Sequence, residues 1–287
     1  MTHQPQSLSI RLSTDGLSFC SFTPEEPQPL AYEEHAVRPV VSMAANLKEA
    51  LVTQPLLRQD YQRVNVLVCT PQFTVMPSEG FERKQGEQAF RFLFPQQAGT
   101  YVTFNLLRRS GVAIVFGFDK NIHQLLLDDF PRARFYASAS PLTELFGERS
   151  ICPGGKRLYA YIHESAIARR IGLQPREMSV YAFDQGRPLL INSYNVGGED
   201  DCLYFLLGVW QQLGFDQCDD TLCLVDEGTI SRPLAERLKR YVQHVRLLDK
   251  GEDFGATLTQ GQAPAAGTPS PLAAIPYDLQ ALLAGGF

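Results

Sequence analysis

The sequence has no uninterrupted apolar run of the roughly 18–20 residues that a membrane helix needs. Its first residues, 1–9, are polar and lead into a strand pattern, which argues against a signal peptide. It also has no excess of positive charge, because 26 Lys and Arg stand against 31 Asp and Glu, a net charge of −5. A negative balance disfavours binding to the phosphate backbone of nucleic acid. We therefore expect a cytoplasmic protein with no membrane insertion and no nucleic-acid partner.

The usual sequence signatures of catalysis and metal binding are also missing. None of the six cysteines forms a C-x-x-C pair, and the closest two, Cys218 and Cys223, have no His or Cys cluster nearby to complete a zinc site. The sequence contains no G-x-x-x-x-G-K-[ST], G-x-G-x-x-G, G-x-S-x-G or H-E-x-x-H motif. We therefore predict reduced, structural cysteines, no metal site and no identifiable catalytic residue.

What the sequence does contain is a regular order of strand and helix patterns. With 287 residues, 44% of them hydrophobic, the chain suits one large domain or two ordinary ones. Two alternating runs within residues 8–23 surround an Asp-Gly pair, which is the strongest short signal for a β-hairpin. A third strand at 30–37, a helix beginning after Ser42 and a buried strand at 63–69 follow.

The first half then continues to a helix that begins near residue 140, and after a break at residues 151–156 the pattern restarts. Three strands are expected at 158–164, 177–184 and 187–196. Next come a helix at 199–213, a buried strand at 221–225, a helix ending near 242 and a last strand at 245–248. Each half is therefore a three-stranded meander followed by alternating α and β elements, although the two halves are not alike in sequence.

This order predicts an α/β protein with mixed sheets, because antiparallel strands lead into right-handed β-α-β crossovers. Two tandem ribonuclease-H-like units are the plan of the actin-like ATPase architecture. We expect the first unit at 1–150, the second at 156–250, and a flexible linker with an apolar C-terminal segment at 251–287. Segments such as LSIRLSTDGLSF, NVLVCTPQFTVMP and EDDCLYFLLGVWQQLG resemble an uncharacterised bacterial family known only as a domain of unknown function. The resemblance extends to about Lys250, supports this fold and implies no chemistry.

An actin-like ATPase holds nucleotide phosphates at glycine-containing turns, where backbone N–H groups approach closely. The Asp15 turn is the best candidate, although an ordinary hairpin turn is the favoured interpretation of the same residues. The turn at Asp184 lies one hairpin too late, unless the strand count has slipped, and a further turn follows the strand at 221–225. The candidate nucleotide contacts are therefore Thr14, Asp15, Gly16, Asp184, Gly186 and Gly228. These turns are acidic, which disfavours phosphate, so we expect no cofactor, with ATP and Mg²⁺ as the alternative.

The C-terminal segment is the other informative feature. Residues 251–274 have the Gly, Ala, Pro, Thr and Gln content of a flexible linker. Beyond them, one face of a short helix would carry Ile275, Leu279, Leu282 and Leu283. Such a face either docks on its own chain or engages a protein partner. The leading hypothesis is a non-catalytic or degenerate cytoplasmic scaffold; the alternative is an ATP-binding ATPase or kinase that uses Asp15 and Asp184.

Overall fold

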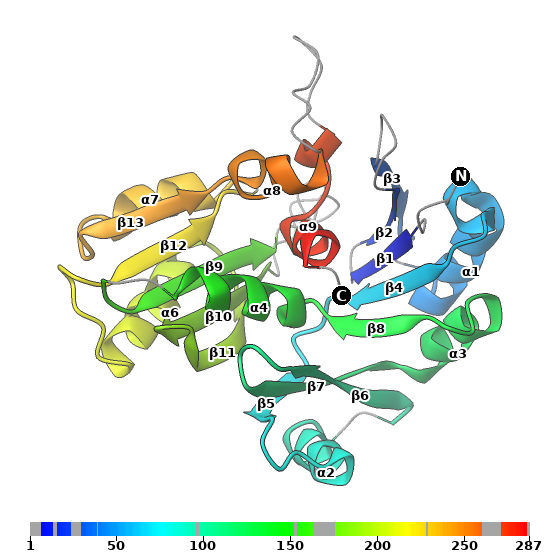
Figure 1. Ribbon diagram of the computed structural model, residues 1–287, viewed down its shortest axis with the longest axis horizontal. Helices are drawn as coiled ribbons and strands as arrows, with labels where there is room; N and C mark the ends of the chain where they lie inside the picture. Colours follow the sequence, from blue (N-terminus) through cyan, green and yellow to red (C-terminus); the bar gives the residue numbers. More distant parts are fainter. Residues whose placement is uncertain are drawn as a thin grey trace. The chain divides into compact units, whose positions relative to one another are not determined.

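The structure of the chain is a computed structural model that describes residues 7–13, 16–23, 30–38, 40–95, 98–151, 154–163, 176–227, 229–259 and 271–285 (Figure 1). It comprises two compact units, each made of separate stretches of sequence. Unit 1 consists of Met1–Leu106, Val112–Pro141 and Phe254–Phe287. Unit 2 consists of Leu107–Gly111 and Leu142–Asp253.

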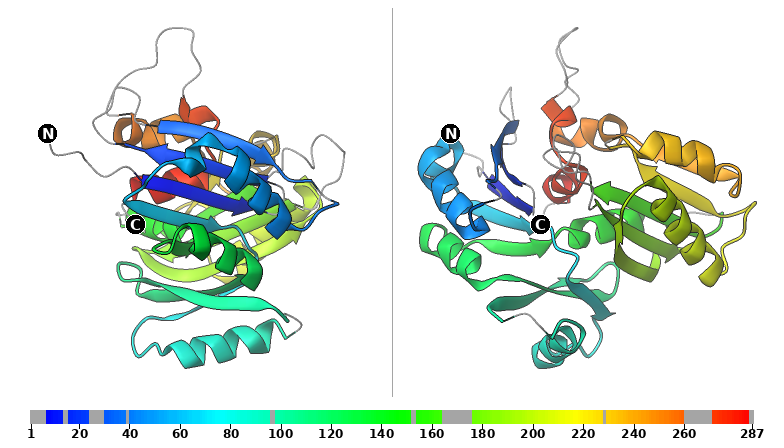
Figure 2. Two further views of the ribbon diagram at one scale, coloured as in Figure 1. Left: turned by 90° about the vertical axis from the view of Figure 1, so that its right-hand side faces the viewer. Right: turned by 180° about the vertical axis from the view of Figure 1, so that it is seen from behind.

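The main sheet of unit 1 has the strand order β3-β2-β1-β4-β8. Its elements are β1 (Ser7–Ser13), β2 (Gly16–Phe22), β3 (Leu30–Ala36), α1 (Met43–Thr53), η1 (Pro55–Arg58), β4 (Arg63–Val68), α3 (Lys120–Asp129) and β8 (Arg134–Ala137). Ser42 caps α1 as predicted, because its Oγ accepts a hydrogen bond from Ala45 N at 3.2 Å. Helices α1 and α3 pack together on one side of the strands (Figure 2), where Ile10, Val66 and Leu126 are fully buried.

A smaller sheet of unit 1, in the order β5-β7-β6, comes between β4 and α3 in the sequence. Its elements are β5 (Phe73–Pro77), α2 (Arg83–Leu93), β6 (Thr100–Leu107) and β7 (Val112–Asp119). Phe90 of α2 packs with Val102 and Val115 of the sheet. A Cβ at Gly117 would lie 2.5 Å from Cζ of Phe90, so glycine there lets α2 approach the sheet closely.

Asn105, in β6, joins the small sheet to the edge strand β8. Its Nδ2 donates to the carbonyl of Phe135 at 2.8 Å, and its Oδ1 accepts from the N–H of Ala137 at 2.9 Å. One side-chain amide thus takes up a donor and an acceptor on the outer edge of β8. An edge strand with its backbone groups occupied is a poor template for pairing with another chain.

Unit 2 has a sheet in the order β11-β10-β9-β12-β13. Its elements are α4 (Ala139–Arg149), which begins in unit 1, β9 (Arg157–His163), β10 (Arg176–Asp184), β11 (Arg187–Val196), α6 (Glu199–Gln212), β12 (Thr221–Val225), α7 (Ser231–Leu238) and β13 (His244–Leu248). The core joins Leu158 of β9 to Trp210 of α6 and Leu234 of α7. Both five-stranded sheets place their strands in the same chain order, which confirms the predicted pair of mixed α/β units.

The C-terminal stretch departs from the composition-based expectation. Residues 251–274 were expected to form a linker, but α8 (Lys250–Leu258) covers the first of them, and η2 (Pro271–Ala273) and α9 (Tyr277–Ala284) follow. The helix α8 forms because Phe254 and Leu258, four residues apart, are both buried. In the part of the chain that the structure describes, no helix has the length and apolar character needed to cross a membrane.

Candidate functional site at the carboxyl edge of the first sheet

In unit 1, the carboxyl ends of the parallel strands β1, β4 and β8 meet at one edge of the sheet. There the N–H of Cys69 donates to the carbonyl of Leu12 at 2.8 Å, and the N–H of Ser138 donates to that of Val68 at 2.9 Å. In open α/β sheets, ligands bind at the carboxyl ends of the strands. The predicted phosphate turn follows the last residue of β1, at this same edge.

Of the residues of that turn, Thr14 and Asp15 lie outside the described residues. Gly16 begins β2 and pairs with Ser13 of β1. A Cβ at position 16 would come no closer than 3.8 Å to the carbonyl oxygen of His35, and the φ of Gly16 is outside the left-handed range. Among the protein atoms there is therefore room for a Cβ at position 16, and the backbone conformation does not require glycine.

The C-terminal helix α9 packs against β1 (Figure 1) and brings a carboxylate to this edge. Nε of Arg11, in β1, donates to Oδ1 of Asp278 at 2.9 Å and to Oδ2 at 3.1 Å. Sγ of Cys69 lies 3.4 Å from Oδ2, and the N–H of Leu279 donates to Oδ1 at 2.8 Å. Donors from β1, from the residue after β4 and from α9 thus converge on one carboxylate.

This ion pair is shielded from solvent. The side chain of Asp278 is fully buried, and that of Arg11 exposes 11% of its surface. A charge removed from water is tolerated when it is paired and hydrogen-bonded, and becomes costly once its partner is lost. The pair therefore fixes where α9 docks on β1.

The apolar residues of the C-terminal segment are already in contact with the chain itself. Ile275, Leu279 and Leu282 are buried, and Leu283 is half-buried. The ring of Tyr277 meets that of Phe254 edge-on, with 4.9 Å between centroids. Of the two interpretations of the segment, docking on its own chain is the one observed.

The helix is also held through its polar face. Nε2 of Gln280 donates to the carbonyls of Leu272 at 2.7 Å and Ile275 at 2.8 Å. The short helix is buried almost all round, including both of its polar side chains Asp278 and Gln280. A helix buried on every side belongs to a core rather than to a detachable tail.

In unit 2, Asp184 and Gly186 belong to the hairpin turn between β10 and β11. Because β10 runs antiparallel to β9 and Phe183 pairs with Arg157, this turn lies at the amino end of β9. The alternative strand count, in which the turn would follow the first strand of the unit, is therefore wrong. The connection that does correspond to the Asp15 turn, residues 164–175, lies outside the described residues.

The Asp184 turn is also closely covered by protein atoms. Gln185 and Gly186 have φ values of 49° and 81°, as a tight two-residue hairpin turn requires. A Cβ at Gly186 would lie 2.6 Å from Cγ1 of Ile151. Glycine is thus explained here by the turn and by packing.

The turn after β12, at the carboxyl edge of the second sheet, carries acids that the chain itself neutralises. Nη2 of Arg232 lies 2.6 Å from Oδ2 of Asp226, and Nζ of Lys250 lies 2.7 Å from Oε1 of Glu227. Gly228 lies outside the described residues. No cluster of three or more His, Cys, Asp or Glu side chains suited to a metal ion occurs within the described ranges.

The described cysteines differ in how far they are exposed to solvent. Cys20 and Cys223 are buried and Cys218 is exposed, whereas Cys152 lies outside the described residues. Burial raises the pKa of the Cys20 thiol to about 12 and that of Cys223 to about 11, which suppresses the reactive thiolate. Both therefore behave as small apolar core residues.

Comparison with known proteins places the chain in a family. Residues 2–245 match the family model described as "Protein of unknown function (DUF3822)". The chain belongs to DUF3822. A search of curated proteins returned no match.

Solved structures confirm the fold of this DUF3822 protein. A crystal structure from Bacteroides thetaiotaomicron VPI-5482, described as a protein with actin-like ATPase fold and unknown function, shares 32% identity and a TM-score of 0.76, covering 90% of this chain and 96% of that one. The PilM-PilN type IV pilus biogenesis complex matches at 13% identity and a TM-score of 0.50, covering 86% and 89%. The ethanolamine utilization protein EutJ from Carboxydothermus hydrogenoformans matches at 9% identity and a TM-score of 0.41, with 85% of both chains covered. The match to the Bacteroides thetaiotaomicron structure confirms the actin-like ATPase fold predicted from element order.

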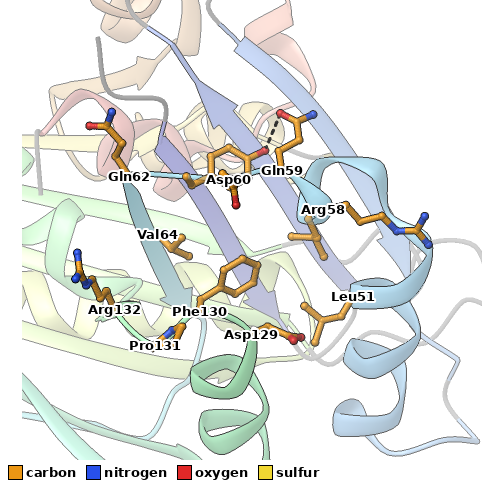
Figure 3. Close-up of a pocket in the computed structure, with 12 residues that line it drawn as sticks. Leu51, Arg58, Gln59, Asp60, Gln62, Val64, Asp129, Phe130, Pro131 and Arg132 are labelled. Atoms are coloured by element: carbon orange, nitrogen blue, oxygen red, sulfur yellow. Dashed lines mark hydrogen bonds between the residues drawn. The ribbon is translucent and has the colours of Figure 1, made fainter. Parts of the chain in front are cut away.

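The DUF3822 chain also has an open pocket at the opposite edge of the first sheet (Figure 3), with a volume of about 710 Å³. Its apolar lining includes Leu51 of α1, Val64 of β4 and Phe130 after α3, and its rim carries Arg58 and Arg132. No predicted site residue lines it. Sequence reasoning missed the pocket because its two stretches, near residues 51–64 and 129–132, meet only in the folded unit.

The residues that sequence reasoning missed at the carboxyl edge are Arg11, Cys69 and Asp278. A signal for two of them was present. Arg11 is the one charged residue in the strand LSIRLS, and Asp278 is the one charged residue in the segment IPYDLQALL. A lone charge within an apolar run is expected to have a partner when the run is buried, but the sequence does not say which partner.

Proposed function

We propose that this DUF3822 protein is a cytoplasmic, non-catalytic scaffold of the actin-like fold that binds a protein partner and does not use nucleotide. The observation that carries the proposal is the Asp278 carboxylate bound to Arg11 at the carboxyl edge of the first sheet. A negative charge fixed at the carboxyl edge of the sheet disfavours a phosphate there, and it occupies Arg11, a cation that could have bound one.

A further observation supports the proposal. The acids Asp226 and Glu227, in the candidate turn after β12, are paired with Arg232 and Lys250. A protein partner is suggested by the structural neighbour PilM, which was solved as a complex with PilN. The inference that this chain also binds a protein rests on the shared fold alone.

A thermal-shift titration of the purified full chain with Mg-ATP tests the nucleotide part of the proposal. A competent site with a Kd of about 10 µM would stabilise the fold by about 2.7 kcal/mol at 1 mM ATP, which is a rise of roughly 5–10 °C in Tm for a chain of this size. We expect no rise beyond that given by Mg²⁺ with inorganic phosphate.

The alternative function, an ATP-binding ATPase or kinase, predicts the opposite result. A saturable rise in Tm that disappears in Asp15→Ala but persists in the surface variant Asp60→Ala would support that alternative and exclude ours.

The protein-partner part of the proposal is tested by cross-linking the full chain in its native cells, identifying the linked protein and reconstituting the pair from purified components. A scaffold should give a stoichiometric complex without added nucleotide.

A further inference from the structure

The two five-stranded sheets differ in how their edge strands are protected from pairing with another chain. In the first sheet, β3 carries Glu33 and Glu34 at its centre, and Asn105 occupies backbone groups of β8. In the second sheet, β13 is only five residues long. Charged side chains, short length and occupied backbone groups all discourage edge-to-edge pairing.

The remaining edge strand, β11, has none of these three protections. It is ten residues long, and residues 188–196 include no charged side chain. Its Pro188 and its one register shift both lie next to the hairpin turn, whereas residues 190–196 pair with β10 in unbroken register. Among the described strands, β10 alone pairs with β11. One row of backbone N–H and C=O groups along β11 therefore has no strand partner.

An aromatic surface continues from this edge onto α6, which packs on β11 (Figure 1). The ring of Tyr194, in β11, stacks on that of Phe205 with 4.7 Å between centroids, and Phe205 meets Tyr204 edge-on at 5.4 Å. Tyr204 exposes 74% of its surface, and Asn192, on the same face of β11 as Tyr194, is also exposed. Aromatic side chains are enriched in protein interfaces, so the edge offers an apolar surface beside its backbone groups.

The charges beyond the two ends of the regular stretch are of opposite sign. Arg187, at the amino end of β11, is exposed and makes no ion pair within the described residues, although Asp184 faces it across the hairpin. Just past the carboxyl end, α6 begins with three acids at 199–201, and Arg237 offsets only one of these charges. Two antiparallel copies of β11 would bring each amino end next to the acidic end of the other copy.

We propose that β11 pairs in antiparallel orientation with β11 of a second copy of this chain, which joins two five-stranded sheets into one. The two-fold axis passes near Ser193, the middle residue of the regular stretch, so that the whole of 190–196 is paired. Asn192 then lies beside Tyr194 of the second copy, and the two aromatic surfaces lie on the same face of the joined sheet. A second copy fits because a two-fold interface must complement itself, as this uncharged strand with unlike ends does.

Sedimentation velocity of the purified full chain, over about 1–200 µM protein, tests this pairing. Wild type should reach twice the mass of one chain at the upper concentrations. Asn192→Lys and Asn192→Glu each place two like charges near the axis, because diagonal neighbours on one face of paired strands are about 7–8 Å apart. Each variant should raise the Kd of the dimer at least about tenfold. The control Gln243→Lys, an exposed change just before β13, should leave the Kd unchanged.

Mixing the two Asn192 variants makes the test specific to the proposed axis. An equimolar mixture of Asn192→Lys and Asn192→Glu brings unlike charges together and should restore the dimer that each variant alone fails to form. Because Asn192 is exposed in the single chain, the circular dichroism spectra of both variants should match that of wild type. Wild type that stays monomeric over the whole range would overturn the proposal, as would dimers that persist in both variants or a mixture that stays monomeric.

Discussion

Loss of Asp278 should destabilise this protein far more than loss of a typical ion-paired carboxylate. In Asp278→Ala the guanidinium of Arg11, only 11% exposed, keeps its charge in a poorly solvated position. Removing one partner of a buried pair costs about 3–5 kcal/mol. Because a chain of this size loses roughly 2–4 °C per kcal/mol, Tm should fall by roughly 6–20 °C.

The matched control is an exposed pair with similar geometry. Nε of Arg83 lies 2.9 Å from Oε1 of Glu87, but the two side chains are 58% and 38% exposed. An exposed i,i+4 pair of this kind is worth about 0.3–0.5 kcal/mol, so Glu87→Ala should change Tm by no more than about 2 °C. Urea unfolding followed by circular dichroism gives both free energies on one scale.

A double variant separates the ion pair from simple loss of packing. Arg11→Leu/Asp278→Leu removes both charges and leaves neither buried alone, so it should be less destabilised than the sum of the two single variants. The reasoning would be refuted if Asp278→Ala stayed within about 1 kcal/mol of wild type, or if the two single effects were simply additive.

Three further outcomes follow from the packing and burial of the described residues. Gly117→Ala should destabilise by about 1–3 kcal/mol in urea unfolding, because its Cβ would lie 2.5 Å from the ring of Phe90, whereas Gly208→Ala, with no atom within 4 Å, should stabilise α6 by about 0.5–1 kcal/mol. Burial lowers the pKa of His123, so the unfolded state takes up its proton first and stability should fall as pH drops below about 6.5; His123→Phe should flatten that slope in urea titrations between pH 5 and 7. Alkylation with iodoacetamide, mapped by mass spectrometry, should label the exposed Cys218 and spare the buried Cys20, and equal labelling of the two would contradict the burial.

The overall fold was predictable because its signals are local. Asp-Gly between alternating runs predicts the first hairpin, and the continuous apolar runs at β4 and β12 predict buried strands. The restart of the same element order after residue 156 revealed the pair of units. Strand β5 and helix α2 were harder to predict, because the exposed α2 contributes only Gly86 and Phe90 to the buried core.

The site was less predictable because it depends on contacts that are distant in sequence. Arg11 and Asp278 are 267 residues apart, and their pairing requires α9 to return to the first strand of the chain. The glycine turns were identified from their residue types alone. The register of β10 against β9 was needed to show that Asp184 lies at the amino end of β9. The linker composition of 251–274 likewise concealed α8, whose burial depends on Phe254 and Leu258.

A crystal structure of the full wild-type chain grown with Mg²⁺ and a non-hydrolysable ATP analogue would decide between a scaffold and an ATPase. We predict that Asp278 remains bound to Arg11 and that no phosphate lies at the carboxyl edge of β1, β4 and β8. Nucleotide phosphates at the turn that contains Asp15, with the Asp278 carboxylate moved away from Arg11, would contradict the proposal that this protein works without nucleotide.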